Sequence, residues 1–240
     1  MRDEAYDLMA RHEDVYWWYR ARREIISATA TRFFHPGGAV LDYGCGTGSI
    51  GLRLGQSGFA VTCADRDPRA LSACRAKGLP VLDLSRATPL PGGADGVLAC
   101  DVLEHAADDG ELLARLRQAT RPGGRLIVTV PAYEALWSGE DFVSQHYRRY
   151  TRGSLLAALR GAGLRPIWAS YFNTLLFPAV VGAILGMRLT CPRAMYRSNV
   201  RELPGRINTL FCRVFAAERH LLRWVMFPVG ASVLAVAEVW

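Results

Sequence analysis

The sequence predicts an α/β fold built on a parallel sheet, and three observations carry that prediction. Short apolar segments alternate along the chain with segments of helical spacing, the pattern of strands joined by helical crossovers. A glycine-rich turn, residues 44–48, follows the first apolar segment and precedes a helix-like segment. Hydrophobic residues make up 50% of the 240 positions and charged residues 21%, so the chain can bury a full core.

The expected elements follow one another in regular order between residues 39 and 131. Strands are expected at about 39–43, 59–65, 79–83, 95–101 and 125–130, and helices at about 48–57 and 108–120. Pro68 opens a further helix, because proline at a first turn lacks only an amide that a helix start leaves unbonded. Strands that alternate with helices place a ligand at the C-terminal ends of the strands.

The two ends of the chain add further elements. Residues 3–33 are expected to form one helix, since acids come early and arginines late, and His35–Gly38 ends it. Residues 131–152 form a long connection rich in aromatic and charged side chains. A helix is then expected at about 153–162, a sixth strand at 164–172 and a seventh strand at 232–239.

The long stretch between the last two strands indicates an insertion at about 173–229. The stretch from Pro166 to Met187 has no charged residue, and its helical part, about 173–189, is expected either to be buried over the sheet or to contact a membrane. A second helix carries a broad apolar face from Ile207 to Val225 beside several arginines. That helix fits an interfacial membrane helix, a dimer surface or a lid on the N-terminal helix. A basic cluster in the same insertion comprises Arg188, Arg193, Arg197 and Arg201.

Charge and cysteine usage narrow the class of protein. The net charge is +7, and six cysteines are scattered without a CxxC pair, which favours reduced thiols over disulfides or a zinc site. The charged N-terminus lacks an apolar secretory segment. We therefore expect a cytoplasmic protein, at the inner face of the membrane if the insertion contacts lipid.

The glycine-rich turn indicates a nucleotide-like cofactor. Gly44, Gly46 and Gly48 can adopt positive φ and let a ligand approach the backbone, while the free amides of the next helix favour an anionic group. The spacing is GxGxG, which differs from the dinucleotide fingerprint GxGxxG. The Gly-Lys-Ser/Thr ending of phosphate-binding loops is absent. An NAD-dependent oxidoreductase is thus disfavoured.

The segment VLDYGCGTG at 40–48 resembles the first motif of the class I S-adenosylmethionine-dependent methyltransferases. The resemblance continues in order through FAVTCAD at 59–65, PVLDL at 80–84, ADGVLACDVLEH at 94–105 and RPGGRLIVTVP at 121–131. It implies a Rossmann-like, seven-stranded, mostly parallel sheet with helices on both faces, plus a helical apolar insertion between strands six and seven. It also implies S-adenosylmethionine as cofactor and S-adenosylhomocysteine as product.

The resemblance divides the chain into four parts. Residues 1–37 form an N-terminal helical lid, and residues 38–172 form the cofactor-binding core. Residues 173–229 form the apolar and basic helical insertion, which covers substrate or contacts a membrane. Residues 230–240 supply the last strand of the core sheet.

The resemblance assigns the cofactor contacts to strand ends and to the lid. The glycine loop would pass under the methionine part, Asp42 would position its ammonium group, and Asp65 would bind the ribose hydroxyls. The remaining contacts are assigned to Cys45, Thr47, Arg66, Asp83, Leu84, Asp101, Val102, Trp18, Tyr19 and Arg22. Several have a plainer alternative: the acids could cap turns, the tryptophans could anchor the first helix while its arginines are solvated, and Cys45 could be a small loop filler.

The acceptor site is expected in the connection after the fifth strand. His146 and His105 are the candidate bases, since histidine titrates near neutrality, although a loop histidine can equally be a hydrogen-bonded pin. The acceptor pocket would be shaped by Tyr133, Trp137, Asp141, Arg148, Arg149 and Tyr150. Glu140, Asp141 and His146 do not make a convincing ligand set, so we expect no metal ion.

The predicted function is methyl transfer to a lipophilic small molecule such as a natural product, a quinone or terpenoid, or a lipid-linked acceptor. Methylation of oxygen, nitrogen or carbon is equally compatible with these residues. The alternative is a membrane-associated scaffold that binds the cofactor without transfer. The insertion could make a peripheral membrane contact or a homodimer. No base-reading motif accompanies the positive charge, so a nucleic-acid partner is not expected.

Overall fold

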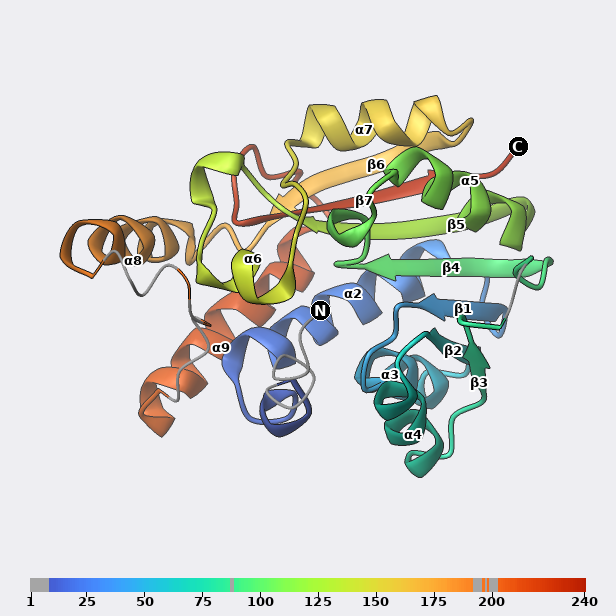
Figure 1. Ribbon diagram of the computed structural model, residues 1–240, viewed down its shortest axis with the longest axis horizontal. Helices are drawn as coiled ribbons and strands as arrows, with labels where there is room; N and C mark the ends of the chain where they lie inside the picture. The colour runs from blue at the N-terminus through green and yellow to red at the C-terminus, as the bar shows by residue number, and fades with distance from the viewer. Residues whose placement is uncertain (1–8, 87–88, 192–195, 197, 199–202) are drawn as a thin grey trace.

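A seven-stranded sheet forms the centre of the molecule (Figure 1), in a computed structural model that describes residues 9–86, 89–191, 196, 198 and 203–240. The strands are β1 (Ala39–Tyr43), β2 (Ala60–Asp65), β3 (Val81–Asp83), β4 (Ala94–Cys100), β5 (Thr120–Pro131), β6 (Arg165–Phe172) and β7 (Ser232–Glu238). Their order is β3-β2-β1-β4-β5-β7-β6, with β7 antiparallel to both of its neighbours and the other pairs parallel. The predicted seven-stranded, mostly parallel sheet is confirmed.

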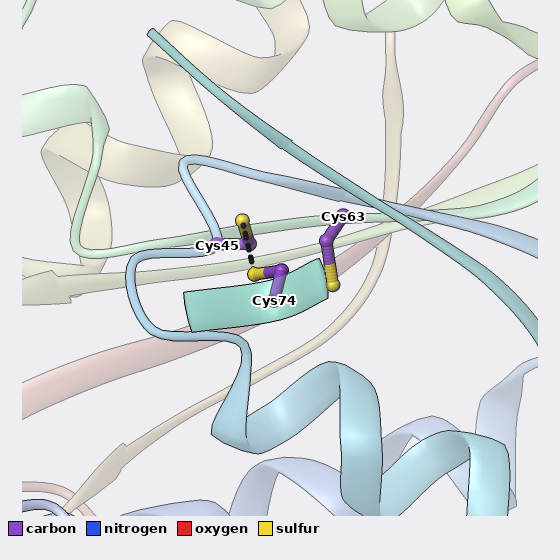
Figure 2. Close-up of side chains that lie close together, drawn as sticks. All are labelled: Cys45, Cys63 and Cys74. Carbon is purple, nitrogen blue, oxygen red and sulfur yellow. Dashed lines mark hydrogen bonds between the residues drawn. The ribbon is translucent and has the colours of Figure 1, made fainter. Parts of the chain in front are cut away.

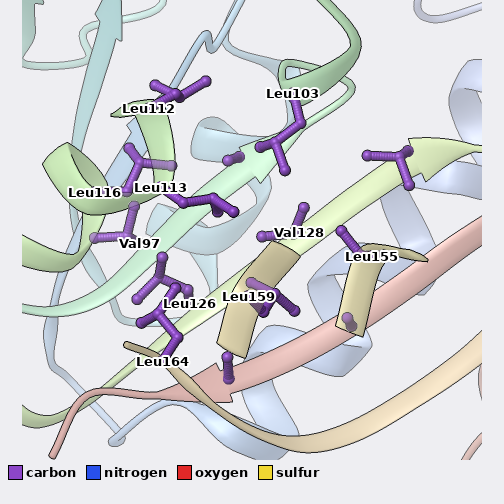
Figure 3. Close-up of a cluster of buried hydrophobic side chains, with 14 of the residues drawn as sticks. Val97, Leu103, Leu112, Leu113, Leu116, Leu126, Val128, Leu155, Leu159 and Leu164 are labelled. Atoms are coloured by element: carbon purple, nitrogen blue, oxygen red, sulfur yellow. The ribbon is translucent and has the colours of Figure 1, made fainter. Parts of the chain in front are cut away.

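Helices cover both faces of this sheet. They are α2 (Trp17–Phe33), α3 (Ser49–Gln56), α4 (Pro68–Ala76), α5 (Asp109–Ala119), α6 (Gly139–Ser144), α7 (Arg152–Gly161), α8 (Phe177–Thr190) and α9 (Gly205–Leu221), with 3₁₀ turns η1 (Leu103–His105) and η2 (Glu134–Leu136). On one face, α2, α3, α4 and α9 share a buried cluster with the sheet. On the other face, the leucines of α5 and α7 pack on β4 and β5, as Figure 3 shows.

Local capping fixes where several of these helices begin. The Asp67 carboxylate accepts a hydrogen bond from the Arg69 amide, and Pro68 occupies the first turn of α4. Asp108 caps α5 by accepting from the Glu111 amide. These caps hold the helices against the carboxyl ends of the strands that precede them. Because the strand order reverses between β1 and β4, a crevice for a ligand is expected there.

The N-terminal region differs from the single helix expected over 3–33. Residues 9–12 are helical, the chain turns at 13–16, and α2 starts at Trp17, while residues 3–8 lie outside the described residues. The Trp17 amide donates to the Asn208 side chain of α9 at 2.9 Å. Glu13 accepts hydrogen bonds from the Thr47 hydroxyl and from Lys77 Nζ, the latter at 2.7 Å. The break therefore lets the N-terminal segment contact the glycine loop.

The insertion between β6 and β7 contains two helices with opposite environments. α9 packs its apolar face on α2, where the fully buried Phe215 contacts the rings of Trp17 and Phe172. α8 buries only Ile184, and Leu189 is 84% exposed. Figure 1 shows α8 standing out from the body of the molecule, so a buried position over the sheet is excluded.

No helix among the described residues combines the length and apolarity needed to cross a bilayer. Arg188 ties α8 to the connection after β5 by donating to the carbonyls of Ala135 and Trp137 at 2.7 and 2.9 Å. Arg193, Arg197 and Arg201 of the expected basic cluster lie outside the described residues.

Candidate active site

A cavity of about 1380 Å³ lies at the carboxyl ends of β1, β2 and β4. Its walls come from the glycine loop, α2, η1, the connection after β5, and α8. The predicted cofactor residues that line it are Trp18, Tyr19, Arg22, Asp42, Gly44, Cys45, Gly46, Thr47, Asp65, Arg66, Leu84, Asp101 and Val102. Residues far apart in the sequence thus converge on one site because parallel strands end at the same edge.

Gly48 and Asp83 are not among the lining residues. Gly48 lies behind the loop, where an added Cβ would come within 2.6 Å of Cys74 Sγ. The Asp83 carboxylate accepts from the amide and the hydroxyl of Ser85 at 2.9 and 2.6 Å. Asp83 is the last residue of β3, and its side chain closes the turn that follows.

The glycine loop is tightly packed, and a Cβ added at Gly44, Gly46 or Gly48 would come closer than 3.0 Å to a neighbouring side chain. Gly44 has φ +69°, and a Cβ there would lie 2.6 Å from Val102 Cγ2. Gly46 has φ +54°, and its amide donates to Asp65 Oδ2 at 3.0 Å. Asp65 also accepts from the Asp67 amide at 2.9 Å. The carboxylate at the end of β2 therefore faces the loop whose backbone forms the cavity floor.

Two acids, the buried Asp42 and the partly exposed Asp101, line the cavity at the ends of β1 and β4. Asp42 is 2% exposed, its Oδ2 has no hydrogen-bond partner among the described residues, and burial raises its pKa to about 7. Asp101 has φ +57° and forms an ion pair with Arg22 at 2.7 Å. Arg22 also donates to Thr129 Oγ1 at 3.0 Å and lies over the Trp18 ring. The first helix is thereby pinned to the end of β4.

The opposite wall is organised by Asp141, whose side chain is fully buried. Arg149 donates to both of its oxygens at 2.8 Å, and His146 Nδ1 lies 2.8 Å from Oδ1. Burial alone would raise the pKa of Asp141, but the hydrogen bonds from His146 and Arg149 hold it below its ordinary value. The carboxylate is therefore ionised, so His146 carries its proton on Nδ1 and leaves Nε2 as the acceptor.

Both predicted histidines line the cavity, and a third group accompanies them. The rings of His105 and His146 are 4.6 Å apart, and burial followed by the charge of His146 lowers the pKa of His105 to about 3. Glu104 is fully buried, neither of its carboxylate oxygens has a partner among the described residues, and burial raises its pKa well above the ordinary value.

Glu104 was missed as a site residue, although it lies between two predicted ones in the run DVLEH. The short turn η1 brings it and His105 into the cavity together. Glu104, His105 and His146 each offer one ligand atom, and these atoms lie within 4.8 Å of one another, so the set could hold a metal ion.

Four of the six predicted acceptor residues do not line the cavity. Tyr133 stacks on Tyr171 in the core beneath α7, and the Tyr150 hydroxyl donates to Asp109 at the start of α5. Arg148 pairs with the same aspartate, and Trp137 packs on Phe142. Asp141 and Arg149 do line it. The apolar side chains that line this part of the cavity are Leu136, Val180, Ala183, Ile184 and Met187.

Comparison with known proteins identifies the family. The methyltransferase domain family model matches residues 16–168. The ubiquinone biosynthesis O-methyltransferase of Xanthomonas euvesicatoria pv. vesicatoria is 29% identical over 160 residues, which cover 57% of this chain and 66% of that protein. The chain thus spans just under two thirds of the length of this relative.

Solved structures agree on the fold. A SAM-dependent methyltransferase from Archaeoglobus fulgidus has a TM-score of 0.57 at 18% identity, covering 90% of this chain and 94% of that one. The 1,6-didemethyltoxoflavin-N1-methyltransferase of Burkholderia thailandensis, solved with S-adenosylhomocysteine, has a TM-score of 0.53 at 18% identity, covering 92% and 80%.

The chain belongs to the methyltransferase domain family. Its fold is that of S-adenosylmethionine-dependent methyltransferases of known structure. The cavity fits that cofactor in two respects: the cradle at Gly44 would be filled by a Cβ, and the buried Asp42 Oδ2 and Arg22 Nε lack partners among the described residues. The cradle at Gly44 lets a ligand approach the backbone closely, and Asp42 Oδ2 and Arg22 Nε offer polar groups to a charged ligand.

Proposed function

We propose that this enzyme methylates a hydroxyl group of a lipophilic small molecule, with His146 as the base. Two observations support the choice of acceptor. The sequence relative is named an O-methyltransferase. The cavity wall opposite the glycine loop is apolar where α8 borders it. The bound cofactor supplies an electrophilic methyl group on a sulfonium centre.

On the cofactor side, the chain's own residues bind and orient. We propose that Asp65 accepts from the ribose hydroxyls and that Asp42 and Asp101 attract the positively charged methionine end. Arg66 and Leu84 would flank the adenine. Trp18, Tyr19 and Arg22 would close the site from the first helix and exclude water. These roles follow the positions of the residues around the cavity.

On the acceptor side, His146 takes the proton of the acceptor hydroxyl at Nε2. The contact that carries this proposal is the 2.8 Å hydrogen bond between His146 Nδ1 and the ionised Asp141, which fixes the tautomer and the ring. A positive charge that develops on His146 is stabilised by the same carboxylate. His105 stays neutral beside it and so adds no opposing charge.

The test is a comparison of His146→Gln with His105→Gln on hydroxylated aromatic acceptors that carry an isoprenoid tail. We expect His146→Gln to lower kcat by about 10²–10⁴-fold, the usual contribution of general base catalysis. S-adenosylhomocysteine affinity should be unchanged in both variants. Equal turnover of His146→Gln and wild type would remove the base assignment.

The rival function is cofactor binding without transfer. It predicts normal S-adenosylhomocysteine binding and no methylated product from any acceptor. Product formation from radiolabelled S-adenosylmethionine, detected with a panel of tailed and tailless phenols, separates the two. A preference for tailed acceptors of at least tenfold in kcat/KM is expected for the lipophilic site.

We further propose that α8 meets an anionic membrane surface and admits the acceptor from it. Val180, Ile184 and Met187 line the cavity, whereas Leu185 and Leu189 of the same helix are 50% and 84% exposed. Exposed arginines accompany exposed apolar side chains on α9, which suits headgroups of opposite charge. These α9 residues are Arg206, Arg213, Ile207 and Leu210.

Flotation with vesicles of phosphatidylglycerol and phosphatidylcholine tests the membrane contact. The double substitution Leu185→Ser with Leu189→Ser should reduce binding at least fivefold without changing S-adenosylhomocysteine affinity, because neither residue lines the cavity. Unchanged flotation, or a wild-type dimer that loses its partner in this variant, would contradict the membrane contact and favour a second subunit.

A further inference from the structure

Three thiols meet behind the glycine loop, as Figure 2 shows. Cys45 belongs to the loop itself, Cys63 to β2 and Cys74 to α4. Their sulfur atoms all lie within 4.8 Å of one another, and the Cys45 and Cys74 sulfurs are 3.6 Å apart. Cys63 and Cys74 are fully buried, whereas Cys45 is half-buried and lines the cavity. Neither methyl transfer nor the proposed base uses this group.

The spacing of the three sulfurs suits a single metal ion. A thiolate lies about 2.3 Å from a bound d¹⁰ ion, so three thiolates around one ion are about 4 Å apart. The sulfurs already have nearly this separation, so small side-chain rotations would suffice to bind an ion. The three cysteines come from a loop, a strand and a helix, so an ion would cross-link elements that the sequence holds far apart.

The ligand set selects the kind of ion. Three sulfurs without an oxygen or nitrogen ligand favour a soft cation, and structural zinc almost always takes four ligands. Among the described residues, no fourth metal-binding side chain joins these three within the same distance. Lys77, whose Nζ donates to the Thr47 carbonyl at 2.8 Å, and Arg75 place positive charge near Cys74. Both cations offset the negative charge of a thiolate cluster.

We propose that Cys45, Cys63 and Cys74 form a three-thiolate site for a soft d¹⁰ cation such as Cu(I), and that its occupation weakens cofactor binding. Each thiol releases its proton to solvent as its sulfur bonds to the ion, and no change of oxidation state is involved.

The link to the cofactor runs through the Gly46 carbonyl. Cys45 Sγ and Cys74 Sγ both donate to that oxygen, at 3.6 and 3.5 Å. Ion binding removes both protons and leaves electron-rich sulfurs against the carbonyl oxygen. The Gly46 amide is held by Asp65 at 3.0 Å, so repulsion at the carbonyl distorts the loop at the place where Asp65 supports it.

The experiment titrates reduced protein with Cu(I) under anaerobic conditions against a chromophoric copper chelator. We expect one ion per chain, with a thiolate-to-copper ultraviolet band. Cys63→Ser and Cys74→Ser should each reduce the affinity by at least tenfold. Cys212→Ser, which changes a cysteine of α9 outside the cluster, should match the wild type.

A second readout measures S-adenosylhomocysteine binding by calorimetry with and without the ion. One bound equivalent of Cu(I) should weaken it about fivefold in the wild type, which corresponds to the loss of one hydrogen bond. The ion should have a smaller effect in Cys74→Ser, which lacks one of the two sulfurs that contact the Gly46 carbonyl. The proposal would be overturned if Cu(I) affinity were unchanged in both Cys63→Ser and Cys74→Ser, or if bound Cu(I) left the S-adenosylhomocysteine affinity of the wild type unchanged. The copper titration needs no acceptor, so it stands or falls separately from the proposed reaction.

Discussion

The two sides of the cavity are built in different ways. On the cofactor side, three carboxylates lie within a residue or two of a strand end: Asp42 in β1, Asp65 at the end of β2 and Asp101 after β4. On the acceptor side, side chains from separate segments hold one another. Asp141 of α6 binds Arg149 and His146, and Arg188 of α8 binds two backbone carbonyls.

Because the two sides are built differently, amino-acid substitutions on them should have different effects. The parallel sheet positions the cofactor groups, so a substitution there should affect ligand binding more than folding. Side-chain pairing positions the acceptor groups, so a substitution there should affect local stability first. The following variants test that contrast, beginning with the largest expected effect.

Asp141→Asn should lower the free energy of unfolding by about 3–5 kcal/mol, because it leaves the buried Arg149 guanidinium without its counter-charge. Arg149 is only 10% exposed and Asp141 not at all. The measurement is urea unfolding at pH 7, with Asp14→Asn as control. Asp14 is 71% exposed in its ion pair with Arg23, so its loss should cost under about 1 kcal/mol.

The same variant carries a pH signature. The folded-state pKa of Asp141 is lowered, so its contribution is complete above the unfolded-state pKa of about 3.9 and fades as pH falls toward the folded value. The stability difference between wild type and Asp141→Asn should therefore shrink as pH falls below 4. A difference that grows in that range would contradict an ionised Asp141.

The two insertion helices give the next contrast. Phe215→Ala in α9 should destabilise the protein by about 3 kcal/mol or more, since it opens a cavity beside Trp17 and Phe172. Leu189→Ala in α8 should change stability by less than about 0.5 kcal/mol, because this side chain is 84% exposed. Thermal unfolding measures the stability of both variants. Equal losses of stability would mean that α8 is packed against the rest of the protein.

Gly44→Ala tests the cofactor side with a smaller effect. The residue has φ +69°, and its Cβ would meet Val102 at 2.6 Å, so the loop must shift. We expect S-adenosylhomocysteine affinity to fall about tenfold, or about 1.4 kcal/mol. Gly55→Ala in α3 meets nothing within 4 Å and should leave affinity unchanged. Calorimetry measures both affinities. Equal S-adenosylhomocysteine affinities of the two variants would contradict a close approach of the ligand to Gly44.

The fold and the cofactor side could be predicted from the sequence because both rest on local patterns. Apolar segments that end in an acid or a glycine mark the carboxyl ends of strands, so the sequence predicts that Asp42, Asp65 and Asp101 lie together, and all three line the cavity. Asp83 looked alike in sequence, yet its side chain closes the turn after β3 by accepting hydrogen bonds from Ser85. An acid at the end of a strand can line a ligand cavity or close a local turn, and the neighbouring backbone decides between these two roles.

The acceptor side could be predicted only in part because tertiary contacts decide it. Tyr133 and Tyr150 lie in the same aromatic, charged connection as His146, but both turn into the core beside α7 and α5. The apolar composition of α8 suggested burial, yet the helix has only Ile184 buried. Composition measures how apolar a helix is and carries no information about what covers it.

The most direct test of the whole account is calorimetric titration of S-adenosylhomocysteine into wild type, Asp65→Ala and Asp83→Ala, with NAD as a control ligand. Asp65 supports the glycine loop and lines the cavity, whereas Asp83 does not line it. We expect micromolar binding to wild type and Asp83→Ala, at least tenfold weaker binding to Asp65→Ala, and none of NAD. Folded wild-type protein that fails to bind S-adenosylhomocysteine, or that binds NAD instead, would contradict the account.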